Sequence, residues 1–256
     1  MSVLLQVSDT HFGTERASVV EALVKLAGEL RPDVVVLSGD ITQRARRHEF
    51  DAARRLVERL AAPALLAIPG NHDIPLFNLA ARISDPYGAY ARVFGRDLEP
   101  SYESADLLVL GVNTTRAYRH KHGEVSEQQI ERVAARLKGA TQEKLKVVVT
   151  HHPMHVPPGT DEENLLRGYV KATRAWASAG ADLVMGGHIH LPFIRQTDAG
   201  RPLWVAQAGT AVSRRVRPGG EANSVTVVRC AAEVATVERL DYNGSRFALV
   251  DAVRIN

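Results

Sequence analysis

The chain repeats one pattern: a short apolar run rich in β-branched residues, followed within two residues by Gly, Asp, Asn or His. Such runs predict buried strands. They span residues 3–7, 34–37, 65–68, 147–150 and 183–185. In open α/β sheets, ligands bind beyond the carboxyl ends of the strands, so polar residues far apart in the sequence are expected to converge there.

Helical patterns separate these runs, over residues 18–30, 48–60 and 127–137. The last begins after Ser126 and has Gln129 three positions later, which predicts a capping box. Because strand and helix alternate through residue 185, we expect right-handed βαβ units and a parallel or mixed sheet.

After His190 the pattern changes to successive strands with turn residues between them. These strands are expected at residues 193–195, 203–207, 224–230, 233–240 and 247–253. We therefore expect an α/β fold with four layers, an αββα sandwich of two mixed β-sheets flanked by helices. In this prediction the second half supplies an antiparallel-rich sheet stacked on the first. Three long loops, at residues 74–100, 113–125 and 153–165, are typical of segments that select a substrate.

Length and composition fit one domain over residues 1–256, since no linker or internal repeat divides the chain. The net charge of +3 permits an anionic substrate without indicating a nucleic-acid-binding surface. Cys230 is the single cysteine, so no internal disulfide or thiolate-rich metal site is expected. The first strand begins too early for a signal peptide, and no apolar stretch reaches the ~20 residues of a membrane span. These features predict a cytoplasmic protein without membrane attachment.

Polar residues with metal-binding chemistry follow the predicted strands. Each is ambiguous alone, because Asp and Asn often form turns and a lone His is more often an ordinary polar group. Together, and in this order, they indicate a metal centre. The candidate ligands are Asp9, His11, Asp40, Asn71, His151, His188 and His190. His72 and Asp73 stand beside Asn71 and are candidates for acid and base chemistry.

These motifs resemble, one for one, those of the calcineurin-like metallophosphoesterase superfamily over residues 3–209. They are Asp9-x-His11, Gly39-Asp40, Gly70-Asn71-His72-Asp73, His151 after a strand, and Gly187-His188-x-His190. Residues 38–43 and 69–73 resemble in sequence the corresponding motifs of bacterial class III cyclic-nucleotide phosphodiesterase-like proteins. The chain departs from the family pattern at Ala45, where Gly is frequent, and at Gln43, where phosphoprotein phosphatases carry an acid. The second departure argues against a phosphoprotein substrate.

The resemblance implies the metallo-dependent phosphatase fold and a division of the ligands between two ions. Asp9, His11 and His190 would hold the first, Asn71, His151 and His188 would hold the second, and Asp40 would bridge them. His151 and the adjacent His152 compete for one ligand position, and the family pattern favours His151. A nitrogen and oxygen donor set without thiolate suits two divalent or mixed-valence ions of the Mn, Fe or Zn class.

Charge leads to a mechanism. Two divalent ions and two carboxylates have a net charge of about +2, and a bridging hydroxide would reduce it to about +1. This charge matches one phosphodiester anion. We expect this hydroxide to attack phosphorus while His72, oriented by Asp73, protonates the leaving oxygen. The expected substrate is a small phosphodiester such as a cyclic nucleotide.

Other partners and functions are less favoured. A nuclease of the repair-exonuclease type would usually add a DNA-capping region, and a catalytically silent scaffold would tend to lose ligands. Nucleic acid is therefore a less favoured partner, whereas a homodimer is compatible with the sequence. Basic residues gather at 116–122 and 214–217. We expect Arg116 and Arg119 to contribute to substrate recognition rather than to stability.

Overall fold

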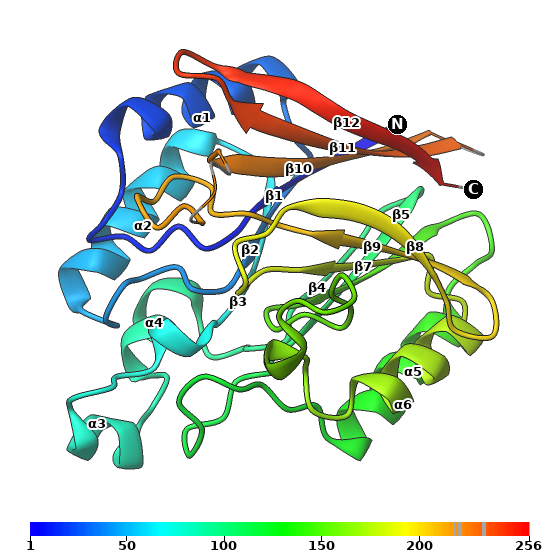
Figure 1. Cartoon of the computed structure of the whole chain (residues 1–256), viewed down its shortest axis with the longest axis horizontal. Helices are drawn as coiled ribbons and strands as arrows, with labels where there is room; N and C mark the ends of the chain where they lie inside the picture. Colours follow the sequence, from blue (N-terminus) through cyan, green and yellow to red (C-terminus); the bar gives the residue numbers. More distant parts are fainter. Residues whose placement is uncertain (218, 220–221, 232–233, 256) are drawn as a thin grey trace.

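Two β-sheets pack face to face between two layers of helices in the computed structural model (Figure 1). The structure describes residues 1–217, 219, 222–231 and 234–255. The predicted α/β fold, an αββα sandwich of two mixed sheets, is confirmed. No helix within the described ranges combines the length and apolarity needed to cross a bilayer.

The first sheet joins the beginning of the chain to its end. Its strands are β1 (Ser2–Val7), β2 (Val34–Ser38), β3 (Ala64–Ile68), β10 (Ser224–Ala231), β11 (Val234–Tyr242) and β12 (Phe247–Ile255). Their spatial order is β12-β11-β10-β1-β2-β3. β1, β2 and β3 are parallel, whereas β10 pairs antiparallel with the free edge of β1 and continues into β11 and β12.

The second sheet is built from the middle of the chain. Its strands are β4 (Ser101–Glu103), β5 (Leu107–Val112), β6 (Leu145–Thr150), β7 (Leu183–Gly186), β8 (Phe193–Asp198) and β9 (Pro202–Gln207). The order is β4-β5-β6-β7-β9-β8, with β5, β6, β7 and β9 parallel and an antiparallel strand at each edge.

Helices cover the outer faces of both sheets (Figure 1). The helices are α1 (Ala17–Leu30), α2 (Arg47–Leu60), α3 (Leu79–Ser84), α4 (Gly88–Phe94), α5 (Glu127–Gly139) and α6 (Tyr169–Ser178), with the 3₁₀ turns η1 (Asn71–Asp73) and η2 (Glu162–Asn164). Of these, α3 lies apart from the sheets, at the lower left of Figure 1. The capping box of α5 is confirmed. The backbone amide of Gln129 donates to Ser126 Oγ at 3.2 Å, and the backbone amide of Ser126 donates to Gln129 Oε1 at 2.9 Å.

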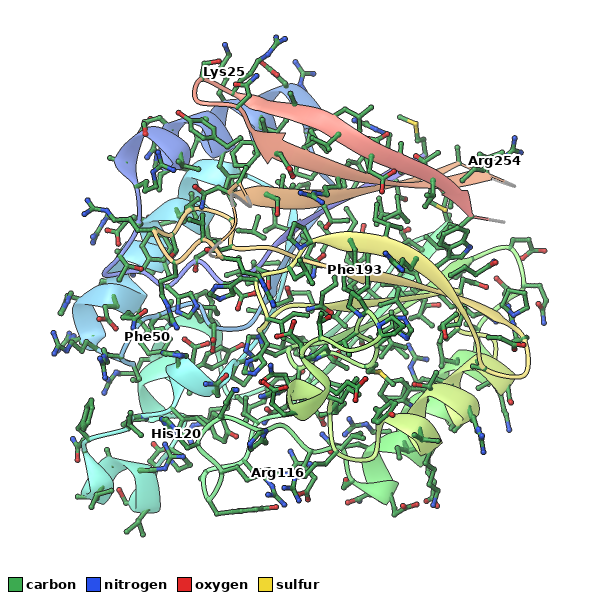
Figure 2. All side chains as sticks on the ribbon, viewed as in Figure 1. Lys25, Phe50, Arg116, His120, Phe193 and Arg254 are labelled. Carbon is green, nitrogen blue, oxygen red and sulfur yellow. The ribbon has the colours of Figure 1, made fainter. Side chains whose placement is uncertain are left out.

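Three apolar clusters fill the three spaces between the four layers. Neighbouring residues of β1 show how: Leu5 packs with α1 and α2, while Leu4 faces the second sheet. Because both faces of such a strand are buried, it appears in the sequence as a continuous apolar run. Phe50 of α2, which is labelled in Figure 2, also packs edge-on against Tyr90 of α4.

The structure differs from the prediction in the sheet that the C-terminal strands join and in the content of one expected loop. The antiparallel strands of the second half do not form the stacked sheet, because β10 to β12 extend the first sheet from the free edge of β1. The expected loop at residues 74–100 contains α3 and α4. The strand predicted for residues 233–240 is β11, although Glu233 lies outside the described residues.

Candidate metal centre

The candidate ligands lie just beyond the carboxyl ends of five parallel strands, β1, β2 and β3 of one sheet and β6 and β7 of the other. Gln6 joins the two sheets beneath them, since its amide nitrogen donates to Ser38 Oγ at 2.9 Å and to the Gly186 carbonyl at 3.1 Å. The site is therefore supported from both sheets.

One group of donors consists of Asp9, His11 and His190, whose donor atoms lie within 4.8 Å of one another. His11 Nε2 is 3.1 Å from His190 Nε2, and His190 Nε2 is 3.3 Å from Asp9 Oδ1. Two imidazole nitrogens so close to each other and to a carboxylate form a pocket that fits a cation.

The carboxylate of Asp40 lies between this group and a second one. Its Oδ2 is 3.7 Å from His11 Nε2, and its Oδ1 is 3.3 Å from His151 Nε2. One oxygen therefore faces each group, which is the geometry that a bridging ligand requires.

The second group contains polar atoms that lack protein partners. Asn71 Oδ1, His151 Nε2 and His188 Nδ1 are buried without a hydrogen-bond partner among the described residues. Leaving a buried polar atom unsatisfied costs about 1–3 kcal/mol, so three in one site require an explanation. Coordination to a cation would satisfy all three, and the residues present thus fit the metal that the resemblance implies.

Backbone carbonyls orient two of the imidazoles. His151 Nδ1 donates to the Ser38 carbonyl at 2.9 Å, and His190 Nδ1 donates to the Arg215 carbonyl at 2.7 Å. Each Nε2 is then directed into the site, where a bound cation would take the place of its proton. This arrangement is typical of metal-ligating histidines.

His152 has the opposite arrangement. Its Nδ1 accepts from Thr114 Oγ1 at 2.8 Å, and its Nε2 donates to the Lys121 carbonyl at 3.0 Å. Burial and the neighbouring His151 lower the pKa of His152 to about 3, so the ring is neutral. With both nitrogens engaged, His152 fastens the loop at residues 113–125 beside the site, which favours His151 over His152 as a ligand.

The charges of the centre reinforce one another. Burial raises the pKa of Asp40, but His151 and His72 more than offset this and bring the pKa well below its ordinary value. Burial lowers the pKa of His151, yet Asp40 and Asp9 outweigh it and raise the pKa to about 9. A cation would replace the proton in stabilising Asp40.

Strained backbone accompanies the ligands. Within the described ranges, nine non-glycine residues have positive φ, and five of them are candidate ligands, namely Asp9, His11, Asp40, His188 and His190. Such conformations cost of order 1–3 kcal/mol each and persist at functional sites. The loops also approach closely: a Cβ on Gly187 would lie 2.4 Å from Asp9 Oδ2, and one on Gly70 would lie 2.3 Å from Asp40 Oδ1.

The expectation that Asp73 orients His72 is wrong. The Asp73 carboxylate accepts hydrogen bonds from the amides of Gly70, Ile41 and Thr42 and from Thr42 Oγ1, at 2.8 to 3.1 Å. Burial and the charge of Asp40 raise its pKa to about 6. Asp73 therefore joins the loops that carry Asp40 and Asn71. The Gln43 carbonyl binds His72 Nδ1 instead, at 2.9 Å.

Arg215 is a residue of the site that sequence reasoning did not single out. Its Nη1 is 3.2 Å from His11 Nδ1 and from Gln43 Oε1, and it donates to His72 Nε2 at 3.3 Å. The basic segment at residues 214–217 was the available signal, but only the fold shows which of its arginines faces the ligands.

The structure shows which groups the side chains of Arg116 and Arg119 contact, and their role in substrate recognition stays a prediction. Arg116 donates to the carbonyls of Asn113 and Thr115 and to Gln129 Oε1, and Arg119 pairs with Glu124 at 2.7 Å. Both side chains hold their own loop together, at the edge of the molecule where Figure 2 labels Arg116.

The chain matches the calcineurin-like phosphoesterase family over residues 2–192 and belongs to that family. It is therefore a metallophosphoesterase. It is 29% identical over 229 residues to the cAMP/cGMP dual specificity phosphodiesterase of Mycobacterium tuberculosis, covering 80% of this chain and 67% of that protein. It is 38% identical over 82 residues to the glycerophosphodiester phosphodiesterase of Enterobacter lignolyticus, covering 28% of this chain and 29% of that one.

Solved structures share the fold at low sequence identity. The purple acid phosphatase of yellow lupin superposes with a TM-score of 0.71 at 12% identity, over 99% of this chain and 53% of that one. A dimetal phosphatase of Danio rerio gives 0.67 at 14% identity, over 100% and 98% of the two chains.

Proposed function

We propose that this protein is a phosphodiesterase that hydrolyses small phosphodiesters, such as cyclic nucleotides, with two metal ions. The observation that carries the proposal is the position of Asp40, with one carboxylate oxygen toward each donor group. Two curated relatives act on phosphodiesters by name, which supports a diester substrate.

In this proposal Asp9, His11 and His190 would hold one ion, Asn71, His151 and His188 would hold the other, and Asp40 would be a ligand shared by the two. Bound ions would activate water as the nucleophile and stabilise negative charge on the phosphate. Their identity is expected within the Mn, Fe and Zn class, because the donors are nitrogen and oxygen only.

The chain itself supplies a cation and a proton donor beside the ligands. The Arg215 guanidinium is placed to donate hydrogen bonds to a phosphate oxygen. When Arg215 donates to a phosphate oxygen in place of His72 Nε2, that nitrogen no longer has to accept a hydrogen bond and can carry a proton. Gln43 holds the opposite nitrogen of the ring, so Nε2 points into the site and can protonate the leaving oxygen.

The function is tested with matched substrates. Manganese-loaded protein should hydrolyse bis(p-nitrophenyl) phosphate and cyclic AMP faster than p-nitrophenyl phosphate, because the site charge suits a monoanion. Elemental analysis should find about two ions per chain. Preference for the monoester would contradict the diester assignment, and selective degradation of single-stranded DNA would favour the nuclease alternative.

Arg215→Gln should raise KM for cyclic AMP by about tenfold or more, because a hydrogen bond to a charged group contributes about 1.5–3 kcal/mol. The metal content should not change, since the ligand side chains remain. Arg214→Gln is the matched control, because Arg214 is the exposed neighbour. An equal KM in both variants would remove Arg215 from substrate binding.

A further inference from the structure

A cavity of about 580 Å³ lies between the start of α2, the segment before α3, and helices α3 and α4. Its lining includes Arg44, Arg46, Arg47 and Arg92, with one carboxylate, that of Asp85. We call it the arginine pocket. Its volume is in the range of small-molecule sites, and its charge suits an anion.

The four guanidinium groups of the arginine pocket have no carboxylate partner in the part of the chain that the structure describes. Elsewhere on the surface arginines do pair, as Arg59 does with Glu21 at 2.6 Å. Arg44 instead lies over the ring of Phe77, 5.1 Å from its centroid, and Phe77 is 77% exposed. This contact orients Arg44 without neutralising its charge.

The arginines also stand at an unfavourable place. Arg44, Arg46 and Arg47 gather at the start of α2, where the helix dipole is positive and favours anions. Glu49, in the first turn, accepts hydrogen bonds from the backbone amides of Arg44 and Arg46 at 2.8 and 3.1 Å. These exposed guanidinium groups line one cavity, and an anion bound there would be attracted by several positive charges at once. Local rules are typically broken in this way at functional sites.

The arginine pocket adjoins the candidate metal centre. A small cavity of about 30 Å³, lined by Asn71 and His72, shares Arg44 and Leu76 with the arginine pocket. A substrate whose scissile phosphate lies at the metal centre can therefore extend past His72 toward the arginines.

We propose that the arginine pocket binds a second phosphate group of the substrate. The preferred substrates are then phosphodiesters that carry a further phosphate, such as 5′-phosphorylated dinucleotides. The proposal rests on the proposed function and specifies its substrate class. Guanidinium groups bind phosphate through paired N–H donors, and such remote contacts supply binding energy to the reaction.

The test compares adenylyl-adenosine with and without a 5′-phosphate, a pair that differs only in the second phosphate. The wild-type protein should show a kcat/KM about tenfold or more higher for the phosphorylated dinucleotide, as one charge-assisted contact provides. The triple variant R46Q/R47Q/R92Q should lose this advantage and keep its rate on the unphosphorylated dinucleotide. R54Q/R55Q/R96Q, which removes the same charge outside the pocket, should behave as wild type.

Binding to chelator-treated protein, measured by calorimetry, separates the pocket from catalysis. The wild-type protein should bind the phosphorylated dinucleotide more tightly, and the triple variant should bind both dinucleotides alike. Retention of this difference with loss of all diester hydrolysis would support the pocket and reject the proposed function. Equal losses in the two triple variants would overturn the proposal in favour of general electrostatic attraction. Stimulation of unphosphorylated dinucleotide hydrolysis by inorganic phosphate would overturn it in favour of an effector site.

Discussion

Asp40→Asn should lower kcat/KM for cyclic AMP by about 10³-fold or more. Charge stabilisation by metal ions contributes several kcal/mol, and each ~1.4 kcal/mol is a factor of ten. The substitution keeps an oxygen that can accept the hydrogen bond from the backbone amide of His72, which donates to Asp40 Oδ1 at 2.8 Å. It removes the negative charge between the two donor groups, so the metal content should fall below two ions per chain.

The measurements for this variant are elemental analysis after manganese loading and initial rates at several metal concentrations. Asp251→Asn is a suitable control, because Asp251 is exposed on β12, far along the chain from every candidate ligand. If Asp40→Asn binds two ions with unchanged affinity, Asp40 does not bridge them and the two-metal proposal fails.

The fold class could be predicted because short apolar runs mark the strands and candidate metal ligands follow the ends of these runs. β1 and β2 are buried on both faces, so each appears in the sequence as a short continuous apolar run that predicts a strand. Asp9 and Asp40 lie two residues after the ends of these strands, and the parallel arrangement brings them to one edge of the sheet.

The partners of the C-terminal strands could not be predicted in the same way. Alternating apolar positions in β10 to β12 identify strands but do not say which free edge they join. The edge of β1 is available because β2 occupies only its other side, a fact of three-dimensional pairing. Helices α3 and α4 escaped notice because six and seven residues contain too few turns to show a helical period.

Contacts within the site were the least predictable part. Asp73 follows His72 in the sequence, but both belong to the 3₁₀ turn η1, in which successive side chains point about a third of a turn apart. Asp73 therefore reaches the buried amides below while His72 faces the site. Arg215 enters the site because β9 and β10 return the chain to the ligands, which no local pattern indicates.

His72→Ala should keep both ions and lose activity according to the leaving group. General acid catalysis is worth about 10²–10⁴-fold, and it matters most when the departing oxygen is strongly basic. Cyclic AMP, with an alkoxide leaving group, should therefore lose far more rate than bis(p-nitrophenyl) phosphate, whose phenolate leaves without protonation. The proposed proton comes from Nε2, which lies 4.0 Å from Asp40 Oδ2.

The rates of His72→Ala should be compared with those of Asp73→Asn. Asp73 holds four buried donors, so its replacement should lower thermal stability and reduce the rates on both substrates by a similar factor. His72 is partly exposed, with 28% of its side chain accessible, so its removal should leave the melting temperature nearly unchanged. Equal losses of His72→Ala on the alkyl and aryl substrates would exclude His72 as the proton donor, and loss of an ion would show that it supports metal binding instead.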